Sequence, residues 1–240
     1  MRFSTSLTIL MYHKVDRIPP KAKHVGNYVL PEAFESQLAA LRSWSYESIG
    51  FEQWLEFRKN GGQLPRRPLI ITFDDGYRST YLNAWPALKR AGFSATVFLV
   101  SDLIGKTNSW DADEIQEPLL NDREILEMRA AGIAFGSHTK THAALTKISE
   151  SQAKLELAGS RRTLEELLGS PVTTLCYPYA KQNSAVRAIA REAGYKSAVI
   201  GRGGLNRRST DPYALRRIKI DTRTSLRSLK LALLRGRLGL

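Results

Sequence analysis

The chain has 240 residues, 42% of them hydrophobic, and a formal net charge of +13 at pH 7. This length and composition suit one large α/β domain with a substantial core. A single cysteine, Cys176, excludes an internal disulfide framework, and its apolar neighbours predict that it is a small buried side chain. The charge is uneven, because residues 201–240 carry 11 of the 36 Lys and Arg residues but only 2 of the 23 Asp and Glu residues. An evenly basic nucleic-acid-binding module is therefore not expected.

Short apolar strands alternate with helices along most of the chain. Helices are expected at about 31–41, around Trp54, before Gly92, and at 122–131, 149–168 and 184–193. This alternation is typical of βαβ units and predicts a mainly parallel sheet. About seven strands are expected, enough to close or nearly close a (β/α) barrel with outer helices. Their predicted ranges are 7–13, 69–73, 95–100, 133–135, 173–177, 197–200 and 215–220.

From about residue 222 the sequence predicts a basic, leucine-rich helix. This helix either packs on the barrel or lies on a membrane surface with its apolar side inward. We expect residues 1–221 to form the main domain, with 222–240 as part of it or appended to it. The apolar stripe consists of Leu226, Leu229, Leu233 and Leu234, and the basic residues around it are Arg227, Lys230, Arg235 and Arg237.

No segment is long enough to span a membrane, and the apolar run at 7–11 is too short for the core of a signal peptide. The expected location is therefore the cytoplasm or the inner membrane surface. At that surface the basic helix can bind anionic lipid head groups.

The predicted strand at 69–73 ends directly on Asp74, Asp75 and Gly76. Ligands and catalytic residues of α/β folds gather beyond the carboxyl ends of parallel strands. Two adjacent carboxylates repel each other there, and a divalent cation would turn that repulsion into coordination. A simple solvated turn would also explain these three residues.

A second group of polar residues follows the predicted strand at 133–135. His138 and His142 are four residues apart, so they can face one ion from a helical turn or a tight loop. Two imidazoles and one carboxylate form a three-ligand set that leaves coordination positions open, as catalytic sites do. Zinc or another first-row divalent ion suits these ligands. The other acid is then free to take a proton from a water whose pKa the metal lowers towards about 7.

These residues resemble the motifs of the polysaccharide deacetylases, the NodB-homology group that forms carbohydrate esterase family 4. Residues 72–76 resemble the family's first motif, and residues 137–142 resemble its second. Residues 177–179 are similar to its third motif. The resemblance covers about residues 7–221. It implies a distorted (β/α) barrel and metal-dependent removal of N-acetyl or O-acetyl groups from sugars.

The same resemblance assigns roles by position. Asp74 corresponds to the general base, and Asp75, His138 and His142 correspond to the metal ligands. Tyr179 and Pro178 correspond to the edge of the acetyl pocket, where a backbone N–H stabilises the oxyanion.

Two positions depart from the family pattern. Cys176 stands where the third motif usually has an arginine that steadies the base, and we expect Arg217 to reach Asp74 instead. The late histidine that protonates the leaving amine is also missing, since all four histidines precede residue 143. Some exopolysaccharide-modifying relatives have a permuted arrangement with a Tyr-His pair at the end of the first strand. Tyr12 and His13 resemble that pair, so we expect His13 to be the general acid.

The sequence thus favours an N-deacetylase of an amino-sugar polysaccharide or its precursor, and an N-acetylated glycan as the partner. A deacetylase of peptidoglycan or of a lipid-linked sugar is an alternative. A non-catalytic glycan- or nucleic-acid-binding barrel is an alternative of another class. Trp110 lies in the loop after the 95–100 strand, where it either stacks on a sugar ring or belongs to the core.

Overall fold

The computed structural model describes residues 6–201 and 203–238, and the side chains only up to residue 234. Its β-strands are β1 (Ser6–Tyr12), β2 (Lys14–Val15), β3 (Tyr28–Val29), β4 (Glu47–Ser48), β5 (Pro68–Phe73), β6 (Thr96–Leu99), β7 (Ala134–Ser137), β8 (Thr174–Cys176), β9 (Ser197–Val199), β10 (Asn206–Arg207) and β11 (Ile218–Lys219). Its α-helices are α1 (Pro31–Ser43), α2 (Phe51–Asn60), α3 (Trp85–Ala91), α4 (Asp122–Ala130), α5 (Glu150–Leu168), α6 (Ser184–Glu192) and α7 (Leu226–Leu238).

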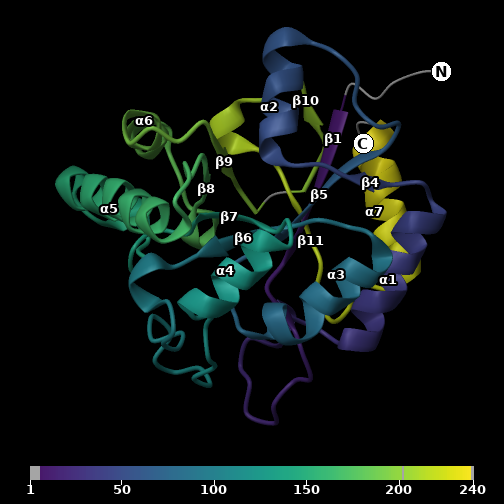
Figure 1. The fold of residues 1–240 in the computed structure, drawn as a ribbon, viewed down its shortest axis with the longest axis horizontal. Helices are drawn as coiled ribbons and strands as arrows, with labels where there is room; N and C mark the ends of the chain where they lie inside the picture. The colour runs from purple at the N-terminus through teal and green to yellow at the C-terminus, as the bar shows by residue number, and fades with distance from the viewer. Residues whose placement is uncertain (1–5, 202, 239–240) are drawn as a thin grey trace.

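A curled parallel sheet forms the centre of the molecule (Figure 1). Strands β1, β5, β6, β7, β8 and β9 follow one another in space, each parallel to the next. The sheet nearly closes because β11 pairs in parallel with β1, while Leu215, just before it, bridges to Val199 of β9. The predicted (β/α) barrel with seven mainly parallel strands is confirmed. The short strands β2, β3, β4 and β10 were not predicted, since two-residue pairings leave no apolar pattern in the sequence.

Two apolar clusters hold the barrel together. The larger lies between the sheet and the outer helices. The smaller fills the barrel interior and includes Leu7 and Ile9 of β1, Ile70 of β5, and Phe51 and Trp54 of α2. Because α2 contributes to this inner cluster, it closes the amino end of the barrel. The carboxyl end is left for polar residues.

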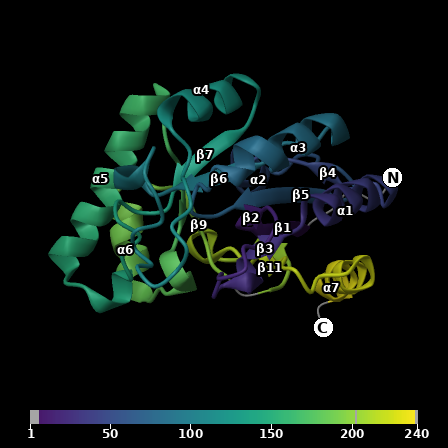
Figure 2. The same ribbon diagram turned by 90° about the horizontal axis from the view of Figure 1, so that it is seen from below.

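Helix α7 lies beside α1 in both views (Figures 1 and 2). Leu229 and Leu233 are buried in the larger cluster, whereas Leu226 and Leu234 are exposed. The predicted apolar stripe is therefore split between a buried side and an exposed side. Arg235 and Arg237 lie outside the residues whose side chains are described, and the division of the chain at residue 221 stays a prediction.

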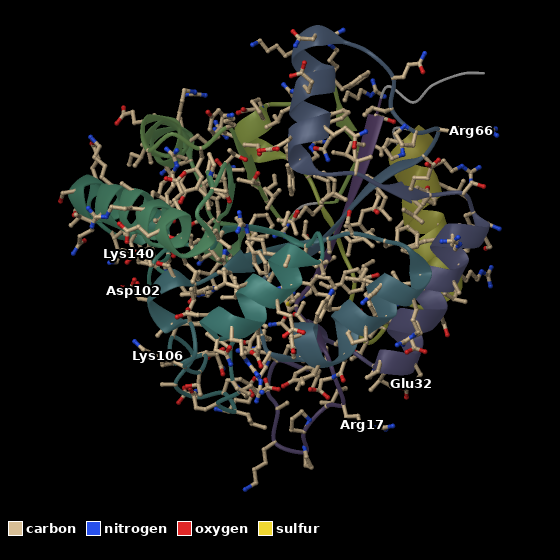
Figure 3. The ribbon with its side chains drawn as sticks, in the orientation of Figure 1. Arg17, Glu32, Arg66, Asp102, Lys106 and Lys140 are labelled. Carbon is tan, nitrogen blue, oxygen red and sulfur yellow. The ribbon has the colours of Figure 1, made fainter. Side chains whose placement is uncertain are left out.

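The loops at the carboxyl ends of the strands are tied to one another. The loop after β6 and the loop after β7 share main-chain hydrogen bonds, from Ser101 N to Thr139 O and from Asp102 N to Lys140 O. The side chains of Asp102 and Lys140 also form an ion pair of 3.2 Å, and Figure 3 shows them close together at the surface. The rim of the barrel is thus built from connected loops. No helix among the described residues has both the length and the apolar character needed to cross a bilayer.

Candidate active site

The alternation of side chains along β5 decides where Asp74 points. Leu69 and Ile71 pack in the outer cluster, and Ile70 packs inside the barrel. Thr72 shares the inward parity of Ile70, since successive side chains of a strand point to opposite faces. Asp74 is two residues further on, and its carboxylate likewise points into the barrel, where it is 3% exposed.

Arg217 meets Asp74 inside the barrel. Its Nη1 lies 2.6 Å from Oδ1 and its Nη2 lies 2.7 Å from Oδ2, which is a bidentate pair. The guanidinium also donates to the Thr72 hydroxyl, the Ile200 carbonyl and the Cys176 sulfur. Burial alone would raise the pKa of Asp74, but Arg217 holds this pKa below its ordinary value. The predicted contact between Arg217 and the first acid is therefore present, and the acid is held as a carboxylate.

Asp75 turns away from this pair towards the rim. Its φ of 73° lies in the left-handed region, and Gly76 follows with φ of 74°. This φ would strain any other residue at position 76, and a Cβ there would also lie 2.8 Å from a Leu99 side-chain carbon, so the turn favours glycine. Asp75 Oδ1 is 3.2 Å from His138 Nε2 and 3.4 Å from His142 Nε2. Burial would raise the pKa of Asp75, but these imidazoles keep it well below its usual range.

Both histidines belong to the loop that follows β7. His138 Nδ1 lies 2.8 Å from the Cys176 carbonyl oxygen, which can only accept, so Nδ1 carries a proton and Nε2 faces Asp75. His142 reaches the same carboxylate from a position with φ of 65°. Left-handed backbone at a non-glycine residue is strained and is concentrated at functional sites. The loop, rather than a helical turn, therefore presents the two imidazoles.

Asp75, His138 and His142 fit a divalent cation. Their ligand atoms lie within 4.8 Å of one another, and all three side chains are buried. The hydrogen bond at His138 Nδ1 is the contact that orients metal-binding histidines. A second group, Asp74 with His138 and Cys176, is equally compact but fits less well. Both oxygens of Asp74 are engaged by Arg217, and burial raises the pKa of the Cys176 thiol, which disfavours the thiolate that a metal needs.

His13 follows β1 and lines the same cavity as the two acids. Its Nδ1 is buried and has no hydrogen-bond partner among the described residues. Burial lowers the pKa of His13, and the carboxylates of Asp75 and Asp74 partly oppose this shift. The protonated imidazole is consequently a stronger acid than an exposed histidine.

The cavity has a volume of about 340 Å³ and opens at the carboxyl end of the barrel. Tyr179 lines it and is 54% exposed, whereas its neighbour Pro178 is buried. Tyr179 and Ala180 both have left-handed φ values, 57° and 55°, so the backbone turns sharply at the wall. Trp110 also lines the cavity, but its ring stacks on His142, with centroids 4.5 Å apart and an angle of 22°. The sugar-stacking role considered for Trp110 therefore competes with a contact inside the protein.

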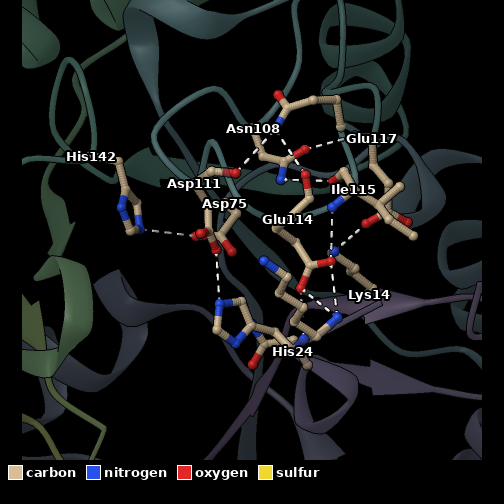
Figure 4. A network of polar contacts seen from close by, with 12 residues as sticks. Lys14, His24, Asp75, Asn108, Asp111, Glu114, Ile115, Glu117 and His142 are labelled. Carbon is tan, nitrogen blue, oxygen red and sulfur yellow. Dashed lines mark hydrogen bonds and ion pairs between the residues drawn. The ribbon is translucent and has the colours of Figure 1, made fainter. Parts of the chain in front are cut away.

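Two loops that are far apart in the sequence line one side of the cavity, and Figure 4 shows the polar contacts that join them. The buried carboxylate of Glu114 accepts hydrogen bonds from the backbone N–H groups of Lys23 and His24. His24 in turn forms a 3.0 Å pair with Asp111. The sequence predicts no role for His24, and nothing near it in the sequence indicates a partner 87 residues away.

An ion pair between the buried Lys14 and the partly buried Glu117 joins the same two loops. The Lys14 ammonium also lies over the rings of Tyr28 and Tyr77, 4.5 and 4.3 Å from their centroids. The sequence contained a weak indication of this network, since Lys14 interrupts an apolar segment next to His13. Its partner could not be inferred, because 103 residues separate them.

Comparisons with known proteins agree with this geometry. A model of the polysaccharide deacetylase family matches residues 61–198. The poly-β-1,6-N-acetyl-D-glucosamine N-deacetylase of Staphylococcus aureus is 28% identical over 185 residues, which are 73% of this chain and 62% of that protein. The chain thus spans less than two thirds of that relative.

Solved structures extend the likeness to nearly the whole chain. A deacetylase of Streptococcus pyogenes in complex with acetate is 25% identical and superposes with a TM-score of 0.84, over 95% of this chain and 98% of that one. A polysaccharide deacetylase from Bacillus cereus is 26% identical with a TM-score of 0.81, over 95% of this chain and 69% of that one.

Proposed function

The chain belongs to the polysaccharide deacetylase family, and we propose from this premise that it is a metal-dependent hydrolase of N-acetyl groups on an amino-sugar polysaccharide or its precursor. One observation carries the proposal. Asp75, His138 and His142 converge within ligation distance, while the neighbouring Asp74 is kept out of that set by Arg217. One cavity therefore contains a three-ligand cation site and a separate carboxylate base.

Asp75, His138 and His142 would hold the metal, for which zinc is our first choice because it takes N and O ligands with an open position. When bound, the ion would supply a Lewis acid for the acetyl carbonyl and would acidify a water molecule. Other first-row divalent ions take the same ligands. The site also excludes bulk solvent, because all three ligands are buried.

Asp74 is the proposed general base. Arg217 fixes the orientation of its carboxylate and keeps it ionised, so it is ready to accept a proton from water. The same guanidinium acidifies Asp74, which makes it a weaker base. Precise placement compensates for this loss, since a positioned base contributes about 10²–10⁴-fold to such reactions.

His13 is the proposed general acid, and it donates its proton to the departing amine nitrogen. Its position at the end of β1, in the same cavity as Asp74 and Asp75, supports this role. The lowered pKa of His13 is consistent with ready proton release. On the other side of the cavity, Tyr179 and the backbone after Pro178 form the proposed edge of the acetyl pocket. A backbone N–H there would donate to the oxygen that becomes negative.

The proposed substrate is an N-acetylated glycan such as a β-linked N-acetylglucosamine polymer. The name of the S. aureus relative supports this class of substrate. The cavity volume lies within the usual range for small-ligand sites, so it fits one residue of such a chain at a time. An O-acetylated sugar, peptidoglycan and a lipid-linked sugar precursor are the alternative substrates.

Contact with an anionic membrane surface through α7 is a second part of the proposal. Leu231 and Leu234 are exposed on α7, close to Lys230. A groove of about 380 Å³ beside them is also lined by Arg66 and Arg67, and Figure 3 shows Arg66 at this edge of the molecule. Leucines interleaved with cations favour anionic head groups.

Vesicle sedimentation tests the membrane contact. Vesicles that contain phosphatidylglycerol should sediment the protein, and vesicles of phosphatidylcholine alone should not. Leu231→Ser should weaken this binding, while Leu155→Ser on α5, where the leucine is 70% exposed, serves as the matched control. Equal losses for the two variants would remove α7 as the contact.

Acetate release from N-acetylglucosamine oligomers tests the catalytic proposal. We expect one acetate for each free amine that forms, loss of release with a chelator, and recovery when zinc is restored. Asp75→Asn should be inactive under all these conditions. Release that continues in the chelator would contradict the metal-dependent mechanism. Oligomer binding without release would favour a non-catalytic glycan-binding barrel, and strongly salt-dependent binding to duplex DNA would favour a nucleic-acid-binding one.

A further inference from the structure

The two ligand histidines are held in different ways. His138 has the usual anchor, a hydrogen bond from Nδ1 to a carbonyl oxygen. His142 has no such anchor, because its Nδ1 is buried and has no hydrogen-bond partner among the described residues. Something else must fix the rotation of this imidazole if Nε2 is to face Asp75.

The backbone of the loop is fixed, but that does not determine the ring orientation. The Glu156 carboxylate accepts hydrogen bonds from the N–H groups of Lys140 and Thr141 and from the Thr141 hydroxyl. These contacts hold the chain up to His142. The imidazole itself can still rotate about its side-chain bonds, so its orientation depends on what packs against it.

Aromatic rings pack against His142 from three directions. The Trp110 indole stacks on one face, with centroids 4.5 Å apart and planes within 22°. Tyr179 meets it edge to face at 4.7 Å and 76°, and His138 does so at 4.8 Å and 79°. Trp110 is the contact that covers a face of the ring, and stacked contacts of this kind set ring orientation.

Trp110 is itself held in place by its loop. Asn108, which is fully buried, donates to the Ile115 carbonyl and accepts from the Glu117 N–H. Asp111, which follows Trp110 in the sequence, pairs with His24 of the other loop (Figure 4). The indole also lies against Tyr77, with centroids 6.3 Å apart. These contacts hold the Trp110 side chain and its loop in place beside His142.

We propose that Trp110 is a positioning residue for the metal site: its indole stacks on His142 and takes the place of the missing hydrogen bond. This inference rests on the proposed metal site formed by Asp75, His138 and His142. It differs from a sugar-stacking role in what it predicts, because a positioning residue acts on metal affinity and a sugar platform acts on substrate affinity.

Zinc affinity, measured by competition with a chromophoric chelator, tests this inference without reference to turnover. Trp110→Ala should weaken zinc binding about 10–100-fold, the usual range for losing a residue that orients a ligand. Trp110→Phe retains an aromatic face, so its zinc affinity should fall by less than about tenfold, below the range for losing the orienting residue. Trp110→Leu retains apolar volume without the ring and should behave like the alanine variant.

Trp85→Ala is the matched control. Trp85 is also partly buried and also packs on an aromatic ring, that of Tyr81 at 5.3 Å, but it lies on α3 and does not line the cavity. Its loss should leave zinc affinity unchanged. Circular dichroism of each zinc-free variant checks that it is folded.

Unchanged zinc affinity in folded Trp110→Ala and Trp110→Leu would overturn the inference. If KM rose at the same time, Trp110 would be a sugar platform and the proposed deacetylase would stand. If the parent protein bound no zinc or other divalent ion, the proposed function would fail together with this inference.

Discussion

Removing the Arg217 guanidinium tests how the barrel interior stabilises Asp74. Arg217→Met keeps a long apolar side chain in place but leaves a carboxylate that is 3% exposed without its counter-ion. Breaking a buried ion pair at one partner costs about 3–5 kcal/mol. For a chain of this length, each kcal/mol lowers the melting temperature by about 2–4 °C. We therefore expect Arg217→Met to melt about 6–20 °C below the parent protein.

A double-mutant cycle assigns this loss to the pair. Asp74→Asn alone leaves the guanidinium unpaired and should also be strongly destabilising. The double variant leaves neither charge unpaired. The unfolding free energy that the double variant loses should be smaller than the sum of the two single losses by about 2 kcal/mol or more. Urea unfolding of all four proteins in a chelator, with a common slope, provides the free energies.

Arg90 and Glu35 form the matched control. Their ion pair has the same 2.6 Å distance as the Arg217 pair, but both side chains are more than half exposed. Exposed pairs contribute at most about 1 kcal/mol, so Arg90→Met should change little. Equal losses of stability in Arg217→Met and Arg90→Met, or additive losses in the cycle, would contradict a stabilising role of the buried pair.

Three further predictions concern catalysis and the cavity wall. Asp74→Asn should lower kcat about 10²–10⁴-fold, and unchanged turnover would remove Asp74 as the base. His13→Ala should retain its metal and lose turnover to a similar extent, and near-normal turnover would refute the general-acid role. Glu114→Gln should lower stability at pH 7 by about 1–3 kcal/mol, because the backbone N–H groups lose a charged acceptor. Burial would raise the pKa of Glu114, but the backbone N–H groups hold this pKa below 4.5. The ionised Glu114 therefore stabilises the fold fully above pH 4.5, and this contribution is lost as the pH falls through the folded pKa. The melting difference between Glu114→Gln and the parent protein should therefore shrink as the pH falls below 4.5, and a constant difference would contradict this account.

The alternation of strands and helices was enough to predict the barrel. The seven predicted strands all lie at their apolar runs, and most of them are buried strands, which leave a continuous hydrophobic run in the sequence. The strand-end positions also placed Asp75, His138 and His142 at the same edge. The left-handed turn at Asp75 decides which of the two adjacent acids faces the imidazoles. The periodicity of the sequence did not indicate this choice, whereas the resemblance to the family did.

The remaining features depend on contacts between distant segments. Cys176 was expected to be only a small buried side chain, yet its sulfur contacts both Asp74 and Arg217. Trp110 was considered for sugar stacking, and the structure places it on His142. Such pairings are fixed by tertiary packing, so no local pattern in the sequence carries them.

Metal content per chain, measured by mass spectrometry on the parent protein, Asp75→Asn and Asp74→Asn, tests the central claim most directly. The three-ligand site predicts one divalent ion in the parent protein, one in Asp74→Asn, where the ligands are intact, and close to none in Asp75→Asn. A full metal complement in Asp75→Asn, or its loss in Asp74→Asn alone, would show that the ion is held by other residues.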